Sequence, residues 1–378
     1  FFIPGFILIH SKEKHNIPTS LFLGTTIGVC VFILSGLILR FLHIPVQFLY
    51  ILTIFSVVYL LKKKLYQHFF SKLSFSDIFA GSILIVLSAL LVFVHMRTGY
   101  SEEGLILSAA RDSLWRLSII SELVHHFPPQ FPGFAGVMLK NYHFYYDFLV
   151  ATTYQLTGIS IIQLYFFCFS SLSAFLFVLG VYALLEKFTK QKIFSTYGTI
   201  LTVLTGNISY ILPYFSDAYN FFARSNIFMS DQPFDQGHNP FNLFSYALVL
   251  SGIFLFMKWQ ETKKFQWILL NCVLFSVAPG VKIYAAIALV LLYGTGVFFE
   301  TLLSKSFDWK VMLPLIALVP SLKFISGSGF SILSFNPGWL LVKMIEDHDR
   351  LFLSNMTLRE SYYRETGNYL RLSFLKIE

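Results

Sequence analysis

Long apolar runs, separated by short polar connections, occupy most of the chain. A bilayer core about 30 Å thick is crossed by roughly 20 apolar residues in a helix, and the runs here reach or approach that length. The run from 266 to 303 is too long for one ordinary span, and Pro279-Gly280 is expected to divide it into a hairpin because proline breaks a helix. The pattern therefore predicts an all-α fold, a polytopic transmembrane helical bundle. The nine predicted spans are 20–41, 46–61, 77–96, 161–185, 194–215, 241–257, 266–278, 281–303 and 311–325.

Composition narrows the class of protein further. Of the 378 residues, 56% are hydrophobic and only 13% are charged, whereas an average soluble domain has about 25% charged residues. So few charges, together with 44 phenylalanines, leave no plausible polar exterior. This excludes soluble globular, disordered, collagenous and disulfide-scaffold proteins. The three cysteines lie inside apolar segments and are expected to be small buried hydrophobic residues.

Lysines predict the orientation of the bundle. When the nine spans are threaded in order, the lysine clusters fall in alternate connections and all on one side, which the positive-inside rule assigns to the cytoplasm. The net charge of +8 is therefore a topology signal, and no nucleic-acid partner is expected. The chain is predicted to be a multi-pass protein of the cytoplasmic (inner) membrane with an external active face. The clusters are Lys12 and Lys14; Lys62, Lys63, Lys64 and Lys72; Lys187, Lys190 and Lys192; Lys258, Lys263 and Lys264; Lys305 and Lys310.

The same threading predicts three regions. Residues 1–96 form N-terminal membrane helices, and the apolar run 1–9 is expected to be the end of a truncated upstream span. Residues 97–325 form a membrane core with long external loops at 97–144 and 216–240. Residues 326–378 form an external polar tail that is expected to begin a truncated domain.

The first external loop contains an amphipathic segment from 109 to 126. Apolar residues recur three and four positions apart, so the segment is expected to form a helix lying in the membrane interface with its apolar stripe toward the lipid. Prolines between 127 and 133 end it, and 141–147 opens a second interfacial helix with His143 and Asp147 one turn apart. The stripe comprises Leu114, Leu117, Ile120 and Val124, and the other faces carry Asp112, Arg116, Ser118, Glu122 and His125.

Asp112 has two interpretations. A carboxylate held on a rigid interfacial helix can accept a proton from an incoming hydroxyl, or hold a divalent ion against a phosphate. Alternatively, Asp112 pairs with Arg116 one turn along the helix and has no chemical role. The sequence leaves both alternatives open.

Other candidates lie further along the external side. Asp231, Asp235 and His238 have metal-compatible side chains, but the intervening Gln, Pro and Gly residues favour a solvated, turn-rich loop. Lys282 can bind a phosphate as a point charge, or extend its amine from a helix end into the interface. For His143, structural anchoring in an aromatic belt is favoured over metal ligation.

Several of these residues carry a resemblance to a known family. Asp112 and the amphipathic helix are followed by Phe-Pro-Pro-x-x-Pro-x-Phe-Ala-Gly at 127–136 and by Tyr142-His143. This order resembles the first external loop of bacterial GT-C (C-type) membrane glycosyltransferases, in particular their very hydrophobic members. Gly-His-Asn-Pro at 237–240 and Gly-Val-Lys-Ile-Tyr at 280–284 are similar to those relatives too, so the resemblance covers roughly 100–325.

The resemblance implies transfer of a sugar from a polyprenyl-phosphate donor on the outer face, with Asp112 as the essential acid. This loop has no Asp-x-Asp pair and Arg116 stands where relatives often have His, so a cofactor such as Mg²⁺ or Mn²⁺ stays an open question, with Asp112, Asp231 and Asp235 as candidate ligands. No Trp-Trp-Asp signature is present, which argues against oligosaccharide transfer to Asn. The expected substrate-binding residues are Arg111, Arg116, His143, His238 and Lys282.

Two other classes of function remain as rivals. One is a transporter or flippase for a lipid-linked saccharide, and the other is a non-catalytic subunit of an envelope-assembly complex. Carboxylates or bases in the middle of the membrane are typical of coupled transporters, and the predicted spans have almost no such charges. The enzyme interpretation further predicts that Asp112, His238 and Lys282 line one cavity, open to the outer face and to lipid.

Overall fold

A computed structural model of the chain describes most of its helical residues. The described residues are 1–10, 16–63, 75–97, 111–134, 136–204, 240–326, 362 and 365–367. Within them, the side chains of His10, Phe75, 93–97, Arg111 and Asp112 are outside the description. Contacts divide the chain into one unit of Phe1–Val203 with Gln236–Phe330 and another of Leu204–Asp235 with Ser331–Glu378. The helices discussed below belong to the first unit, which includes helices from both the 1–96 and the 97–325 regions.

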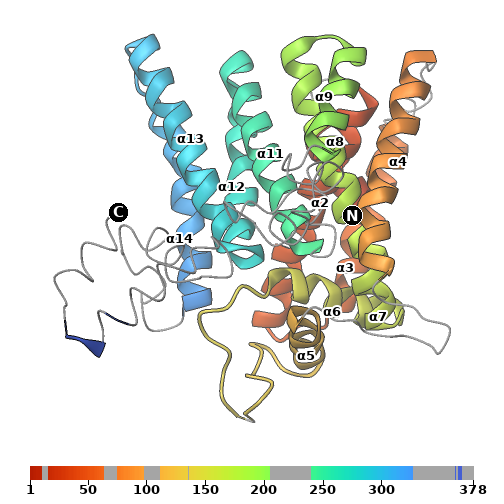
Figure 1. Cartoon of the computed structure of the whole chain (residues 1–378), viewed down its shortest axis with the longest axis vertical. Coiled ribbons are helices and arrows are strands. Elements are labelled where there is room, and N and C mark those ends of the chain that lie inside the picture. The colour runs from red at the N-terminus through yellow and green to blue at the C-terminus, as the bar shows by residue number, and fades with distance from the viewer. Residues whose placement is uncertain are drawn as a thin grey trace. The chain divides into compact units, whose positions relative to one another are not determined.

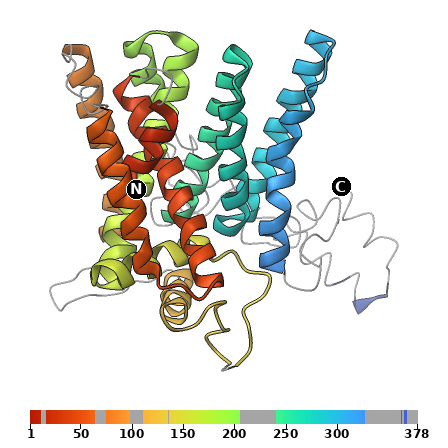
Figure 2. The same ribbon diagram turned by 180° about the vertical axis from the view of Figure 1, so that it is seen from behind.

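The described part of the first unit is all-α (Figures 1 and 2). Five helical stretches are long and apolar enough to cross a membrane, which makes the chain a multi-pass membrane protein. These stretches are α2 (Ile17–Phe41), the continuous Ile161–Thr189, α11 (Pro240–Thr262), α13 (Ile283–Ser304) and Trp309–Ser326. Ile161–Thr189 combines α7 (Ile161–Gln163), the π-helical η3 (Leu164–Cys168) and α8 (Phe169–Thr189), and Trp309–Ser326 combines η7 (Trp309–Met312) and α14 (Leu313–Ser326).

The other predicted spans also fall on helices over their described residues, although these helices do not meet the same length and composition criteria, and 205–215 of the predicted span 194–215 lie outside the description. They are η1 (Val46–Phe48) with α3 (Leu49–Lys62), α4 (Phe75–Arg97), α9 (Lys192–Leu204) and α12 (Phe265–Val281), and the chain opens with α1 (Phe2–His10). The hairpin predicted within 266–303 is present, but its break lies at Lys282 and not at Pro279-Gly280. Pro279 lies in the last turn of α12, where its missing N–H removes one backbone hydrogen bond without ending the helix.

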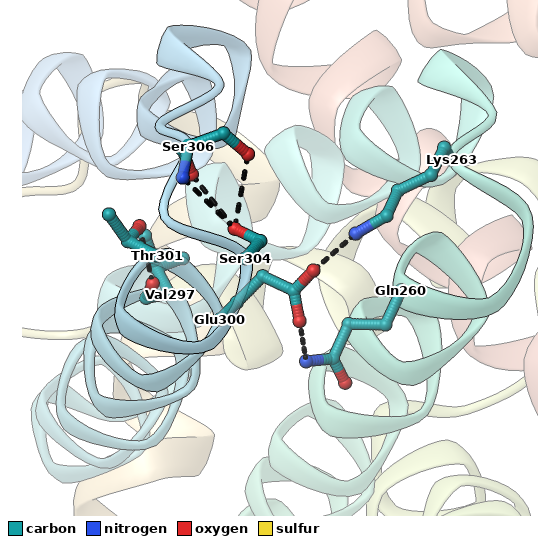
Figure 3. Close-up of polar contacts among 7 residues, drawn as sticks. All are labelled: Gln260, Lys263, Val297, Glu300, Thr301, Ser304 and Ser306. Atoms are coloured by element: carbon teal, nitrogen blue, oxygen red, sulfur yellow. Dashed lines mark hydrogen bonds and ion pairs between the residues drawn. The ribbon is translucent and has the colours of Figure 1, made fainter.

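Ion pairs join the helices at one end of this unit. Lys192 of α9 pairs with Asp77 of α4, and Lys187 of α8 pairs with Glu261 of α11 at 2.6 Å. Figure 3 shows a third contact, in which Glu300 of α13 accepts hydrogen bonds from Lys263 and from Gln260. The lysine-bearing connections α8–α9, α11–α12 and α13–α14 lie at this end, which we call the lysine-rich end (Figure 1).

The opposite end carries α5 (Arg111–His125) and α6 (Tyr145–Thr157), which pack against each other (Figures 1 and 2). Helices are therefore present at both predicted positions, although the second begins at Tyr145 and not at 141, and the burial of Arg116 in α5 was not predicted. Leu114 is 52% exposed, whereas Arg116 is only 2% exposed and lies on the same face as the fully buried Ile119. The physical reason is that α6 supplies a carboxylate, from Asp147, that compensates the buried guanidinium.

Candidate functional site

Arg116 is the centre of a polar cluster between α5 and α6. Its Nη1 donates to Oδ2 of Asp147 at 2.6 Å and to the backbone carbonyl of His143 at 3.0 Å. Its Nη2 lies 2.7 Å from Nε2 of His143. Arg116 and Asp147 are both buried, so this is an ion pair removed from solvent, and such a pair requires good geometry and additional hydrogen bonds to be tolerated.

Aromatic rings extend the cluster to α11 and to the α12–α13 connection. The guanidinium carbon of Arg116 lies 4.1 Å from the ring centroid of Phe241, in the first turn of α11, and 5.0 Å from that of Tyr142. Nζ of Lys282 lies 4.4 Å from the same Phe241 ring. Cations within about 6 Å of an aromatic face are attracted to it. One ring therefore holds two cations that are far apart in sequence.

The end of α12 approaches α6 closely enough to bring Lys282 to this ring. A Cβ atom at Gly280 would lie 2.1 Å from ring atoms of Tyr145, so only glycine permits this packing. Tyr145 is also bonded to α14, since the Ser321 hydroxyl donates to its hydroxyl at 3.0 Å. Lys282 itself has an extended backbone between α12 and α13, with φ −160° and ψ 125°. Backbone packing thus fixes the position of the lysine.

A π-helical segment, η3, contributes the buried Tyr165 to the same region. The Tyr165 hydroxyl is hydrogen-bonded to Ser113 of α5, and its ring lies 6.5 Å from that of Tyr146, the neighbour of Asp147. Single-turn π segments within α-helices frequently occur at functional sites. Nothing in the apolar run 161–185 indicated this irregularity.

Burial and mutual interaction set the charges of the cluster. Burial raises the pKa of Asp147 to about 6, although the Arg116 guanidinium opposes the shift. Burial alone would lower the pKa of Arg116, but the Asp147 carboxylate outweighs it and the pKa is raised. Burial, then Arg116 and Lys282, lower the pKa of His143 to about 3. At pH 7 the cluster therefore holds two cations, one carboxylate and a neutral imidazole, a net charge of +1 suited to an anion.

The tautomer of His143 follows from these contacts. Because the imidazole is neutral and Arg116 donates to Nε2, the ring proton is on Nδ1. The ring stacks on Tyr142 with centroids 4.8 Å apart. His143 is thus held as a neutral hydrogen-bond donor beside Lys282. Oδ1 of Asp147 has no hydrogen-bond partner among the described atoms, and an unsatisfied buried carboxylate oxygen is unusual enough to point to function.

The structure brings together three of the predicted substrate-binding residues, Arg116, His143 and Lys282. Arg111 and Asp112 form the first turn of α5, one turn from Arg116, but their side chains lie outside the description. His238, two residues before α11 begins, also lies outside it. Asp147, Phe241 and Tyr142 were not predicted as site residues. The four-residue spacing of His143 and Asp147 was the available signal: His143 lies two residues before α6 begins, Asp147 lies in its first turn, and both contact Arg116 of α5.

The described residues contain no group of three or more His, Cys, Asp or Glu side chains that could hold a metal ion. Asp231, Asp235 and the carboxylate of Asp112 are outside the described set. Among the described side chains, the carboxylate that pairs with Arg116 is that of Asp147; the side chain of Asp112, the partner considered from the sequence, is outside the description.

No family model, curated protein or solved structure matches the chain.

Proposed function

We propose that the chain is an integral membrane glycosyltransferase of the GT-C type, which moves a sugar from a polyprenyl-phosphate donor to an acceptor on the external face. The observation that supports it is the net positive cluster of Arg116, His143 and Lys282 at the end of the unit opposite the lysine-rich end. In a nine-span topology the positive-inside rule assigns the lysine-rich end to the cytoplasm of a bacterial cell. The cluster then faces outward.

The cluster is suited to a phosphate. Lys282 provides a point charge and the Nδ1–H group of His143 a donor, while the buried Arg116 adds charge and orients the imidazole. A fixed positive environment stabilises the negative charge that develops on a departing phosphate, and restricted water strengthens the effect. His143 and Lys282 are half-buried and so accessible to a ligand, whereas Arg116 and Asp147 are buried.

Asp112 is the proposed general base, or the ligand of a divalent metal. It lies one turn before Arg116 on α5, so its backbone is about 6 Å along the helix axis from that of Arg116. In the reaction the acceptor hydroxyl oxygen forms a bond to the anomeric carbon, the bond from that carbon to the phosphate oxygen breaks, and Asp112 takes the hydroxyl proton. The polyprenyl phosphate leaves with the bonding electron pair, next to Lys282 and His143.

The test is a transfer assay on the full chain in proteoliposomes, with a panel of radiolabelled polyprenyl-phosphate hexoses and pentoses. We expect Asp112→Asn to lower kcat by roughly a hundredfold or more, the typical effect of losing a general base. Lys282→Gln should mainly raise KM for the donor. Lys323→Gln is the matched control, because it removes an exposed lysine in the last turn of α14, outside the cluster. Unchanged transfer by Asp112→Asn would contradict the proposal.

The same preparation separates the rival functions. A flippase would move a fluorescent polyprenyl-phosphate saccharide between leaflets without forming a glycosylated product. A non-catalytic assembly subunit would show neither transfer nor movement. Either result would replace the enzyme interpretation.

A further inference from the structure

A polar cavity opens at the same end of the unit as the Arg116 cluster. It has a volume of about 480 Å³ and lies where the end of α2 meets the end of α5. This volume is within the range of roughly 300–1,000 Å³ that small ligands occupy. Its polar lining is provided by Arg40, His43, His125, His126 and Gln130.

Arg40 is the cation of this cavity. Its Nη2 donates to the backbone carbonyls of Leu123 at 2.6 Å and Val124 at 3.2 Å, near the C-terminus of α5. Its Nε is buried and has no hydrogen-bond partner among the described atoms. No carboxylate in the described part of the chain pairs with it, in contrast to Arg116. A partly buried guanidinium that lines a cavity and has no carboxylate counter-ion in the described part of the chain favours an anion.

Three histidines line the same cavity as this guanidinium. His43 follows the end of α2 with a left-handed backbone, φ 56°. His125 ends α5, and His126 is 3.0 Å from Glu122, which does not itself line the cavity. Imidazoles offer N–H donors in either charge state. The titratable side chains of the lining are thus one guanidinium and three imidazoles, with no acid among them.

The C-terminal end of α5 would by itself repel an anion, because a helix dipole is negative there. Two side chains reduce this effect, since Arg40 binds the carbonyls of Leu123 and Val124 and Gln155 donates to Val124 at 2.7 Å. Capping of the α5 carbonyls would by itself explain the position of the Arg40 Nη2 atom. Capping does not account for the histidine-lined space beside the guanidinium.

We propose that this cavity binds a phosphate-bearing anion, at a site distinct from the Arg116 cluster. The two sites are nine residues apart on α5, from Arg116 to His125, which is about 14 Å of helix axis. The phosphate group can belong to a soluble compound or to the headgroup of an acidic phospholipid. This inference does not depend on the proposed transferase activity.

The test is calorimetric titration of the purified full chain in detergent with sodium pyrophosphate. We expect His43→Asn to weaken binding by roughly tenfold or more, the effect of losing a hydrogen bond to a charged group. Asparagine tolerates the left-handed backbone, so this variant removes the imidazole without straining the turn. Arg40→Gln should weaken binding at least as much, with circular dichroism as the check that the helices remain. Lys140→Gln, an exposed lysine outside the cavity, is the control for general charge and should change binding less than twofold.

Two further measurements complete the design. A binding transition lost in Lys282→Gln belongs to the Arg116 cluster, whereas the transition assigned to this cavity should persist in Lys282→Gln and weaken in His43→Asn; loss of all binding in Lys282→Gln with none in His43→Asn would overturn the inference. Absence of pyrophosphate binding in both detergent and phosphatidylcholine nanodiscs, with no phosphatidylglycerol binding either, would overturn it too. If phosphatidylglycerol in the nanodiscs competes with pyrophosphate in the wild type, the source is a lipid headgroup. If it does not compete, the source is a soluble phosphate.

Discussion

Replacing Arg116 by methionine tests the buried ion pair most directly. Methionine has a similar length but no charge, so Asp147 would remain fully buried without a partner. Removing one member of a buried pair costs about 3–5 kcal/mol. Unfolding entropy is roughly 2.1 cal/mol/K per residue, so for 378 residues this corresponds to a fall in Tm of about 4–6 °C. The measurement is thermal unfolding in detergent, followed by intrinsic fluorescence.

The pH dependence of this variant is a second readout. The folded-state pKa of Asp147 is already raised to about 6 by burial, and loss of the Arg116 charge raises it further. A carboxyl with a raised folded-state pKa contributes stability that is present in acid and lost as pH rises through that pKa. The loss of unfolding free energy in Arg116→Met, relative to the wild type, should therefore be largest near pH 7.5 and smaller at pH 5. Asp147→Asn in the same chain should recover part of it at pH 7.5.

Lys263→Met provides the matched control. It breaks an ion pair with Glu300 in which the lysine side chain is 54% exposed (Figure 3). Pairs exposed to solvent contribute about 0–1 kcal/mol, so Tm should change by about 1 °C at most. The reasoning fails if Arg116→Met is no more costly than this control, or if its deficit is the same at pH 5 and pH 7.5.

Three other results are expected. The pKa of His143 is lowered to about 3, so the neutral imidazole contributes to the free energy of unfolding above pH 6.5, and this contribution is lost on acidification. His143→Gln should reduce the fall in the free energy of unfolding between pH 7 and pH 5 by about 2 kcal/mol, measured through Tm at the two pH values. Gly280→Ala should displace the end of α12 and weaken donor binding, while Gly294→Ala, with nothing within 4 Å of the added carbon, should leave binding unchanged; equal effects would contradict the packing argument. In a cysteine-free chain, a thiol-reactive probe added to intact cells should label Lys140→Cys and spare Ser306→Cys, and the reverse would invert the topology.

The sequence predicted the helices well because each depends on a continuous local signal. Apolar runs longer than about 18 residues indicate spans without knowledge of their neighbours, and the predicted spans coincide with helices over their described residues, apart from the extended Lys282 in 281–303. The predicted break at Pro279-Gly280 was wrong, because one missing backbone donor near a helix end is tolerated. How many of the nine helices cross the bilayer depends on length and tilt, which periodicity alone does not give.

The buried face of α5 could not be found in the same way. An arginine on an amphipathic helix is normally solvated, and the partner that makes its burial possible, Asp147, is 31 residues away. The pairing of Arg116 with Asp147 becomes visible only when α5 and α6 are packed against each other in three dimensions. The convergence of Lys282 on Phe241 likewise depends on the close packing of Gly280 against α6, for which the sequence has no local signal.

The two cations that share the Phe241 ring have a practical consequence for finding the ligand. Two positive charges and one carboxylate are held together by the fold, so an anion that binds there relieves their repulsion and selectively favours the folded chain. Ligand present at a hundred times its Kd raises the free energy of unfolding by about 2.7 kcal/mol, or by about 3 °C in Tm for a chain of this length. Melting curves recorded over a library of phosphates and phospholipids can therefore reveal the natural ligand before any reaction has been observed.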